Sequence, residues 1–376
     1  MVFLNGDDWR RHRTFIHSAF TSPSYKTYFP IFQQTTLKFL SILETLGTGD
    51  FDINPWYSKF TVDVLGKSIF NYDLQNLDMK QNEYYEAYKV ILSNGGILNS
   101  ILVMMVPWVE YLPLPGVLRV KRALAKMNEL FEKVIEEKKN GKNQGDMLDH
   151  LLEAARNDQS LPMVELFSDI FIFFVAGHET TATALSYATA ELAANQDVQE
   201  RLYQDIQKRF GDGLPDFEAV FEEGAKIPYL DWFLQENLRL HPPVTILPTR
   251  VAVSDIEYKG QVIPKGTQVG LGIETIHMNP EVWEDPRRFD PERFSPEKKK
   301  GRHKFAFLPF SLGPRQCIGT EFSEIEQRLF LIHFLKKFKV LPPETLPSKD
   351  LTKNSSLSRP NHFSTLHILQ QLMQPR

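Results

Sequence analysis

Apolar residues recur every three or four positions through the first two thirds of the chain, which is the pattern of helices with one buried face. The predicted helices cover residues 7–20, 23–46, 55–70, 82–92, 116–139, 146–156 and 162–194. Asp7 and Asp8 are placed to cap the first helix, while Gly47, Gly49 and the pair Asn140-Gly141 are placed to end others. This part of the chain is therefore expected to be almost entirely helical.

The pattern changes near Val244, where short runs of apolar and β-branched residues replace the helical spacing. Residues 251–258, 262–263 and 268–273 predict short antiparallel strands, because Gly260, Pro264 and Gly266 interrupt them as turn residues do. Helices followed by a small β region indicate a mostly α (α+β) architecture. No internal repeat or long linker divides the sequence, so we expect one domain over residues 1–376.

Charge and composition exclude several classes of protein. The formal net charge is −4, which gives no electrostatic reason to expect nucleic-acid binding. The single cysteine rules out an internal disulfide. No stretch reaches the roughly 18 uninterrupted apolar residues that a membrane-spanning helix needs.

The only cysteine, Cys317, lies in the run Phe310-Ser-Leu-Gly313-Pro-Arg315-Gln-Cys317-Ile-Gly319. Glycines on both sides of the sulfur permit positive φ angles and a tight loop. Apolar residues at helical spacing follow, so the sulfur is expected at a helix N-terminus, where amides and the helix dipole favour a thiolate. A lone cysteine is more often a small buried apolar residue, but these flanking residues favour a metal-bound thiolate.

The helix predicted over residues 162–194 carries polar residues in its apolar middle, in the run Ala176-Gly177-His178-Glu179-Thr180-Thr181. Such residues cost stability unless they are used. The Thr180 hydroxyl can bond the carbonyl of Ala176, which predicts a bend with a small polar notch. The alternative is that Glu179 is simply a solvent-facing charge. His178 is expected to be structural or pocket-lining and not a ligand.

Two further spacings carry polar pairs. Glu236 and Arg239 lie three residues apart on one predicted helix, and Arg293 follows in a Pro-Glu-Arg-Phe run. Trp9 and Arg13 lie one helical turn apart. Taken alone, Glu236 and Arg239 would be an ordinary surface ion pair worth little, and Trp9 and Arg13 a packed aromatic ring and a surface charge.

Together these motifs, in this order, resemble the cytochrome P-450 superfamily of haem-thiolate monooxygenases, of the microsomal eukaryotic type. Each fixed position of the family's pattern of Phe, Gly, Arg, Cys and Gly is present in the cysteine loop. The resemblance implies that Cys317 is the axial ligand of the iron of haem b, that Arg315 contacts a haem propionate, and that Phe310 packs under the porphyrin. Gly319 completes the haem-binding loop.

The resemblance also assigns roles to the other motifs. It implies that Trp9, Arg13 and Arg250 help to bind the haem, with the two arginines on propionates. It implies that Thr180 and Glu179 are catalytic, the first stabilising bound oxygen and the second, with ordered water, supplying protons. Glu236, Arg239 and Arg293 are implied to form a structural clamp that supports the core and retains the haem.

The implied reaction inserts one oxygen atom from O2 into a lipophilic substrate. The electrons are expected from NADPH-cytochrome P-450 reductase, with cytochrome b5 as a further donor, at the cytosolic face of the endoplasmic reticulum membrane. The mostly apolar residues 173, 174, 176, 244–247 and 358–360 predict the pocket wall, and the basic residues 298–300, 302 and 304 predict a docking face for an acidic donor. The alternatives are an isomerase or dehydratase of the same fold that acts on a peroxide, and an inactive haem-binding fragment.

Eight residues precede Trp9, whereas family members of this type carry an anchor, early helices and strands before that position. We therefore expect an N-terminally truncated catalytic domain, in which the strands near Val262 and Gln268 lack a neighbour.

Overall fold

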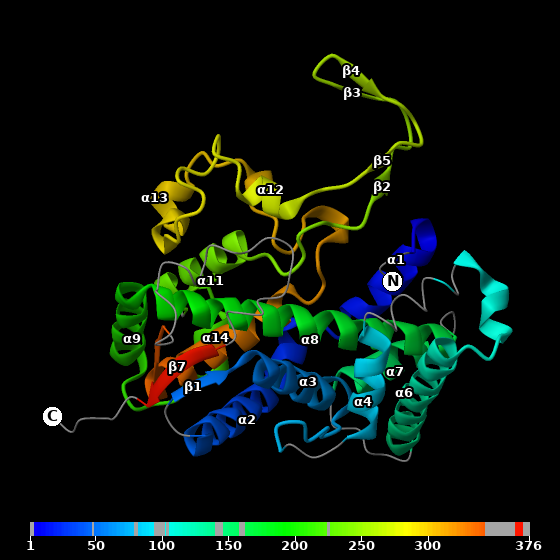
Figure 1. Cartoon of the computed structure of the whole chain (residues 1–376), viewed down its shortest axis with the longest axis horizontal. Coiled ribbons are helices and arrows are strands. Elements are labelled where there is room, and N and C mark those ends of the chain that lie inside the picture. The colour runs from blue at the N-terminus through cyan, green and yellow to red at the C-terminus, as the bar shows by residue number, and fades with distance from the viewer. Residues whose placement is uncertain are drawn as a thin grey trace. The chain divides into compact units, whose positions relative to one another are not determined.

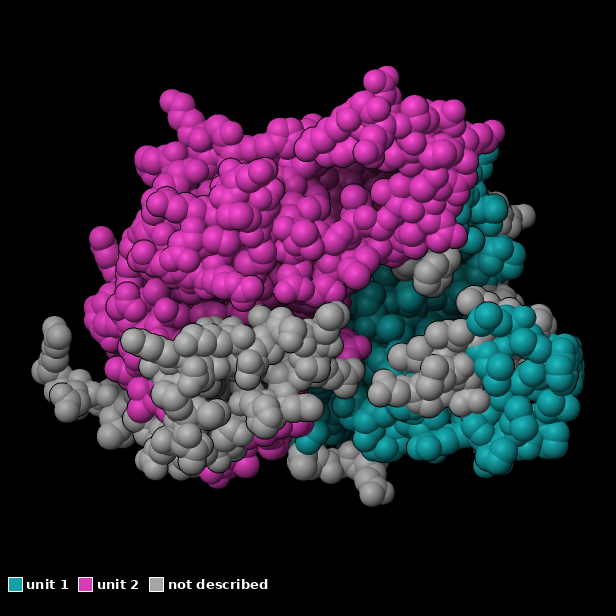
Figure 2. Space-filling view, turned by 45° about the horizontal axis from the view of Figure 1, so that its top comes forward, with its two compact units in different colours: residues 1–42, 58–178 teal, residues 43–57, 179–376 magenta. Residues whose placement is uncertain are grey.

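The computed structural model describes residues 4–46, 49–78, 82–93, 102, 105–139, 146–157, 162–223, 226–342 and 365–370. The chain divides into two compact units, coloured separately in Figure 2. Unit 1 comprises residues 1–42 and 58–178, and unit 2 comprises residues 43–57 and 179–376. The single catalytic domain expected over residues 1–376 stays a prediction.

Unit 1 is built from helices (Figure 1). They are α1 (Gly6–His17), most of α2 (Ser22–Leu46) and α3 (Asn54–Phe70), α4 (Glu83–Leu92), the 3-10 helix η1 (Pro107–Tyr111), α6 (Pro115–Lys139), α7 (Met147–Asn157) and the first half of α8 (Met163–Ala194). Helix α6 buries Val117, Val120, Met127 and Phe131 on one face, with α4 packed along it. The helices follow the predicted ranges closely because the apolar spacing that identifies them also forms the core.

The predicted cap of the first helix is wrong. The N-cap residue is Asn5, which makes no side-chain capping bond, and Asp7 and Asp8 lie in the first turn of α1. There they still oppose the positive end of the helix dipole. Helix α2 ends at Leu46, but Gly49 begins a strand; the other predicted stops, Gly47 and Asn140-Gly141, lie outside the described residues.

Unit 2 combines further helices with a three-stranded antiparallel sheet. The helices are the second half of α8, α9 (Gln196–Phe210), α10 (Phe217–Phe221), α11 (Pro228–Leu240), α12 (Ile273–His277), η2 (Pro291–Phe294), α13 (Pro296–Lys299), η3 (Lys304–Ala306), η4 (Gly313–Arg315) and α14 (Thr320–Lys337). The sheet has the order β1 (Gly49–Asp52), β7 (Thr365–Gln370), β6 (Phe338–Leu341). Helix α14 packs against α9 and α10 and is buried along most of its length.

The remaining strands form an arm (Figure 1) in which β2 (Arg250–Val251) pairs with β5 (Gln268–Val269) and β3 (Ile256–Tyr258) pairs with β4 (Gln261–Ile263). Lys259 and Gly260 have positive φ angles and make the two-residue turn at its tip. The continuous strand predicted over residues 251–258 is wrong, because the backbone bends between β2 and β3, where Asp255 accepts the amide of Lys265 at 2.7 Å. The strand predicted over 268–273 ends at Val269, since Ile273 begins α12.

The mostly α architecture with small antiparallel sheets is confirmed. Strand β1 was not predicted from the sequence. Within the ranges that the structure describes, no helix combines the length and the apolar character needed to cross a membrane.

Candidate functional site

The cysteine loop leads directly into a helix. Cys317 lies just before Thr320, the first residue of α14, and its side chain is exposed. Its amide donates to the carbonyl oxygen of Phe310 at 2.9 Å, which closes the loop on itself, and the Thr320 hydroxyl donates to the Cys317 carbonyl at 2.9 Å. The prediction that the sulfur lies at the start of a helix is confirmed.

The two glycines of the loop have different reasons to be glycine. Gly313 has φ of 78°, a conformation that side chains disfavour. Gly319 has φ of −87°, so the positive φ that glycine permits is not used there. A Cβ on Gly319 would lie 4.0 Å from the Cys317 sulfur, in ordinary van der Waals contact. The glycine therefore leaves space for other atoms beside the sulfur.

Arg315 of this loop and Arg250 of β2, both in unit 2, lie near enough for their charges to interact. Burial and the neighbouring Arg250 guanidinium both lower the pKa of Arg315. Arg250 donates to the carbonyl of Pro248 at 3.2 Å, and no carboxylate among the described residues forms an ion pair with it. Like charges at short range repel, and an anion between them removes that cost. This pair therefore fits a ligand that carries carboxylates.

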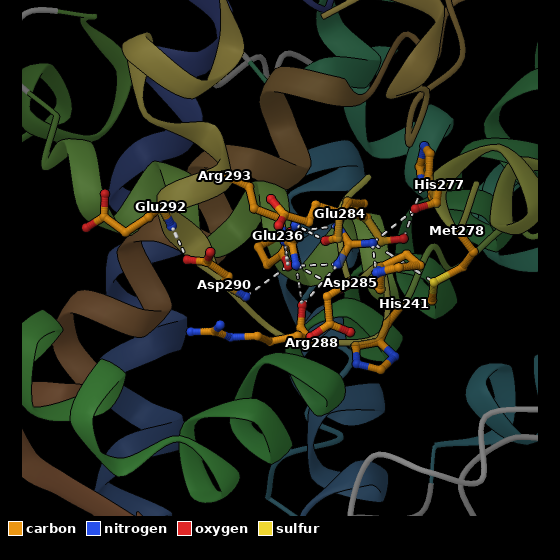
Figure 3. Close-up of polar contacts among 12 residues, drawn as sticks. Glu236, His241, His277, Met278, Glu284, Asp285, Arg288, Asp290, Glu292 and Arg293 are labelled. Carbon is orange, nitrogen blue, oxygen red and sulfur yellow. Dashed lines mark hydrogen bonds and ion pairs between the residues drawn. The ribbon is translucent and has the colours of Figure 1, made fainter. Parts of the chain in front are cut away.

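The predicted clamp is present and buried (Figure 3). Arg239 donates to both oxygens of Glu236, from Nε to Oε2 at 2.7 Å and from Nη2 to Oε1 at 2.8 Å. Arg293 Nε lies 3.3 Å from Oε1, and the Asp290 amide donates to the same oxygen at 2.9 Å. Burial raises the pKa of Glu236, and the two guanidinium groups oppose that shift. The arrangement is the satisfied, bidentate form in which a buried carboxylate is tolerated.

The clamp also fixes the irregular segment between α12 and η2. Arg239 Nη1 donates to the carbonyls of His277 at 3.0 Å and Pro286 at 2.8 Å. Arg293 donates to the carbonyls of Glu284 and Asp285, the second at 2.8 Å. Guanidinium groups thus satisfy the carbonyls of a segment that has no regular secondary structure of its own.

His277 joins the clamp to the segment before the cysteine loop, and sequence reasoning missed it. Its Nε2 accepts the amide of Leu308 at 2.8 Å, so Nδ1 carries the hydrogen and donates to the Arg239 carbonyl at 3.1 Å. Burial lowers the pKa of His277 to about 4. A lone histidine at the end of a short helix carries no signal for this role, because both partners are backbone groups.

Trp283 is buried between the same elements. The guanidinium of Arg239 lies 5.0 Å from the indole ring and that of Arg302 lies 4.1 Å from it. Phe294 and Phe307 complete the cluster around the indole. Cation–π contacts at these distances stabilise desolvated arginines.

The helix motif lies in the middle of α8. Glu179 and Thr180 are half-buried, and their catalytic roles stay predictions. Gly177 lies against Leu65 of α3, whose Cδ2 would be 3.1 Å from a Cβ on that glycine, so close packing explains the glycine. His178 is buried; its Nδ1 lies 2.6 Å from the Tyr88 hydroxyl and its carbonyl accepts from Thr61 at 3.1 Å.

Trp9 and Arg13 lie one turn apart on α1, in unit 1, and both are half-buried. Between them, His12 is buried, with Nε2 3.2 Å from Glu165 and Nδ1 hydrogen-bonded to Asp169, both of α8. The contact of Trp9 and Arg13 with a haem stays a prediction.

Comparison with known proteins decides the family. The family model described as Cytochrome P450 matches residues 1–366. The chain belongs to the cytochrome P450 family. It is 31% identical over 372 residues to human cytochrome P450 4F2, covering 93% of this chain and 70% of that protein. It is 32% identical over 371 residues to human cytochrome P450 4F12, with the same coverage, and 29% identical over 383 residues to cytochrome P450 4e2 of Drosophila melanogaster, covering 96% and 71%.

Membership in this family makes the protein a haem-thiolate monooxygenase, and therefore an oxidoreductase. The family implies a haem with cysteine ligation, and the described residues fit that group. Cys317 is the only cysteine of the chain, and its exposed sulfur stands at the start of α14. The adjacent Arg250 and Arg315 suit the carboxylates of a porphyrin edge.

Proposed function

We propose that this cytochrome P450 inserts one atom of O2 into a lipophilic substrate with electrons from NADPH-cytochrome P450 reductase. The second oxygen atom leaves as water after the uptake of two electrons and two protons. The observation that carries the proposal is the exposed Cys317 sulfur in a loop closed by its own amide, next to paired arginines. Cytochrome b5 is a further candidate donor for the second electron.

In this proposal Cys317 binds the iron of haem b, and Arg250 and Arg315 bind propionates. Phe310, which is half-buried, packs beside the sulfur, and Gly319 leaves space there. Trp9 and Arg13 are assigned to the haem by resemblance to the family. When bound, thiolate-ligated haem supplies electron density that favours cleavage of the O–O bond.

The protein's own contribution to oxygen activation is the placement of protons. Thr180 holds a hydroxyl, and Glu179 a carboxylate, in the middle of a helix that is apolar over most of its length. We assign to the Thr180 hydroxyl the retention of a proton beside the oxygen, and to Glu179, through ordered water, the supply of protons from solvent. The clamp of Glu236, Arg239 and Arg293 acts indirectly, by keeping the segments before the cysteine loop in place.

The substrate is proposed only by class. Phe173 is buried in unit 1, and Val244 and Ile246 are exposed apolar residues of unit 2, which suits a lipophilic molecule. Phe174, expected in the pocket wall, packs against Phe70 and Tyr88 inside unit 1, and residues 358–360 lie outside the described part.

Docking of the electron donor is assigned to the basic segment before the cysteine loop. Lys298, Lys300 and Lys304 are exposed, whereas Arg302 is engaged with Trp283. Exposed lysines attract an acidic partner and raise the rate of encounter at low salt. We further propose that the enzyme meets its reductase at the endoplasmic reticulum membrane, as the resemblance to microsomal members of the family implies.

The test combines a spectrum with turnover. The haem-loaded protein is reduced under carbon monoxide, and the strongly red-shifted band of thiolate-bound haem is expected. Cys317→Ser should lose that band, while Ser254→Ala, a similar change at an exposed position, should keep it. NADPH consumption and product formation are then measured with reductase and a panel of lipophilic compounds.

A red-shifted band that persists in Cys317→Ser would overturn the ligand assignment. A protein that rearranges hydroperoxides without consuming NADPH would support the isomerase or dehydratase alternative. Bound haem without either activity would support an inactive haem-binding protein.

A further inference from the structure

The threonine that follows Thr180 is hydrogen-bonded to α14, the helix that begins after the cysteine loop. Thr181 Oγ1 lies 3.0 Å from Ser323 Oγ. The amide of Gln327, one turn further along α14, donates to Ser323 Oγ at 3.0 Å and to the Ser323 carbonyl at 3.2 Å. All three residues belong to unit 2, and Thr181 and Gln327 are buried.

Two hydroxyl residues further along α8 bond the carbonyls of their own helix. Thr189 donates within its own helix, to the carbonyls of Leu185 and Ser186, each at 3.0 Å, whereas Ser186 donates both to the Ala182 carbonyl at 2.8 Å and to the Asn54 side chain of α3 at 3.1 Å. Such internal bonds are the usual way for a helical Ser or Thr to be satisfied. Among the described residues, the Thr181 hydroxyl bonds only Ser323, so its contribution is between helices.

Helix geometry converts that bond into a constraint on Thr180. Successive residues of an α-helix point about 100° apart around the axis, since a turn holds about 3.6 residues. Fixing the direction of the Thr181 Cα–Cβ bond therefore fixes the direction in which the Thr180 side chain leaves the helix. The other end of the link, Ser323, is six residues from Cys317 along a continuous loop and helix.

Gln327 keeps Ser323 in the required rotamer. Its amide nitrogen donates to both the carbonyl and the hydroxyl oxygen of Ser323, which sets the orientation of the Gln327 amide as well. A serine hydroxyl rotates readily when it is unsupported, but this one is approached from two sides. The three side chains thus form a short relay of hydrogen bonds with a defined geometry.

We propose that Thr181, Ser323 and Gln327 are positioning residues that set the rotation of the oxygen-activating segment of α8 relative to α14. Loss of the link lets the Thr180 hydroxyl turn away from the position where it retains a proton. Electrons then leave as hydrogen peroxide instead of entering product. This inference rests on the proposed role of Thr180.

The experiment compares the haem-loaded wild type with Thr181→Val, Ser323→Ala and the double variant. In Thr181→Val, valine keeps the shape of threonine without its hydroxyl, and the Ser323 hydroxyl retains Gln327 as a partner. In Ser323→Ala, Gln327 still donates to the backbone carbonyl of residue 323, so the fold is preserved in both. Each single variant should keep the ferrous-CO band but raise the ratio of peroxide to product about fivefold, the factor for one hydrogen bond. The double variant should be no worse than either single variant, and Thr181→Ser should restore coupling.

A matched control is Thr189→Val, which makes the same change two turns further along α8, where the hydroxyl bonds its own helix. It should leave the ratio unchanged. Additive effects of Thr181→Val and Ser323→Ala, or an equal effect of Thr189→Val, would overturn the relay.

Amide hydrogen exchange of residues 179–184 separates this inference from the proposed function. The relay predicts about fivefold faster exchange there in both single variants, whatever the chemistry. If Thr180→Ala keeps the wild-type ratio of peroxide to product, the proposed role of Thr180 is wrong. If amide exchange in Thr181→Val and Ser323→Ala is then also unchanged, the relay is overturned as well. If Thr180→Ala uncouples turnover but Thr181→Val does not, the positioning role fails even where exchange has changed.

Discussion

The imidazole of His277 connects two backbone segments that are distant in sequence: Nδ1 donates to the carbonyl of Arg239 and Nε2 accepts the amide of Leu308. Arg239 is at the centre of the clamp, and Leu308 comes two residues before Phe310, whose carbonyl accepts the Cys317 amide. A continuous set of hydrogen bonds therefore runs from the buried carboxylate of Glu236 to the loop of the proposed thiolate.

Replacing His277 should weaken haem retention. His277→Phe keeps an aromatic ring but leaves the Leu308 amide and the Arg239 carbonyl unsatisfied, at a cost of about 1–3 kcal/mol for each group. We expect loss of haem during purification and partial conversion of the ferrous-CO band to that of a weakened or protonated thiolate. His303→Phe, at an exposed position, should change neither measurement. Equal haem content in His277→Phe would show that the bridge is dispensable.

Two buried imidazoles should make the protein less stable in mild acid. Burial lowers the pKa values of His277 and His333 to about 4, from 6.5. Between pH 4 and pH 6.5 the unfolded chain binds more protons at these histidines than the folded protein does. The stability contributed by the two neutral imidazoles is therefore complete above pH 6.5 and is lost as the pH falls toward 4. Each contributes a slope of up to about 1.4 kcal/mol per pH unit to the free energy of unfolding. Urea titrations of wild type and His333→Phe across this range should diverge; parallel curves would contradict the assignment.

Arg239→Lys should destabilise the protein strongly although the substitution conserves the positive charge. Lysine cannot make the paired bonds to Glu236 and also satisfy the carbonyls of His277 and Pro286. Breaking a buried pair costs about 3–5 kcal/mol, and the protein should lose both stability and haem. Arg201→Lys is the control, because Arg201 pairs with Glu292 where both side chains are partly exposed, and its loss should cost under about 1 kcal/mol. Similar effects of the two changes on thermal unfolding would argue against the clamp.

Arg250→Gln and Arg315→Gln should each lower haem affinity about tenfold, the loss expected for one charge-assisted hydrogen bond. Haem transfer to apomyoglobin gives the comparison, with Arg287→Gln, an exposed arginine, as the control. If the two arginines bind no anion, removal of one charge should instead relieve their repulsion and raise stability without changing haem transfer.

Gly177→Ala should destabilise the protein although alanine is the better helix former. The added Cβ would lie 3.1 Å from Leu65 Cδ2, and the cost of overpacking exceeds the gain of about 1 kcal/mol in helix propensity. In a Leu65→Ala background the same change should become stabilising by about 1 kcal/mol. A double-mutant cycle measures the difference, and an identical effect in both backgrounds would show that Leu65 is not the reason for the glycine.

Sequence reasoning worked where chemistry requires particular residue types at short, fixed spacing. The loop around Cys317 and the pair Glu236 and Arg239 are of this kind, and the structure closes both as hydrogen-bonded units. The helices were also predictable, because their apolar spacing is the same property that buries them.

The rest depends on partners that no local pattern reveals. Strand β1 exists because it pairs with β7, more than three hundred residues later, and its four residues show no alternation of their own. His277 and Ser323 bond groups that the fold brings to them, so neither has a recognisable neighbour in sequence. Asp7 and Asp8 were wrongly predicted as caps because the helix begins earlier, at Gly6, with Asn5 as its N-cap residue.

The buried indole of Trp283 is an intrinsic fluorescence probe of the clamp region. Its ring is 1% exposed and has two guanidinium groups within 5.0 Å, whereas Trp108 is 64% exposed to solvent. Nearby positive charges shift the emission of an indole, and burial shields it from quenchers added to the solvent. The emission of Trp283 therefore reports on the segment between α12 and the cysteine loop. It should change when Arg239 separates from Glu236 and should not change when only surface residues rearrange.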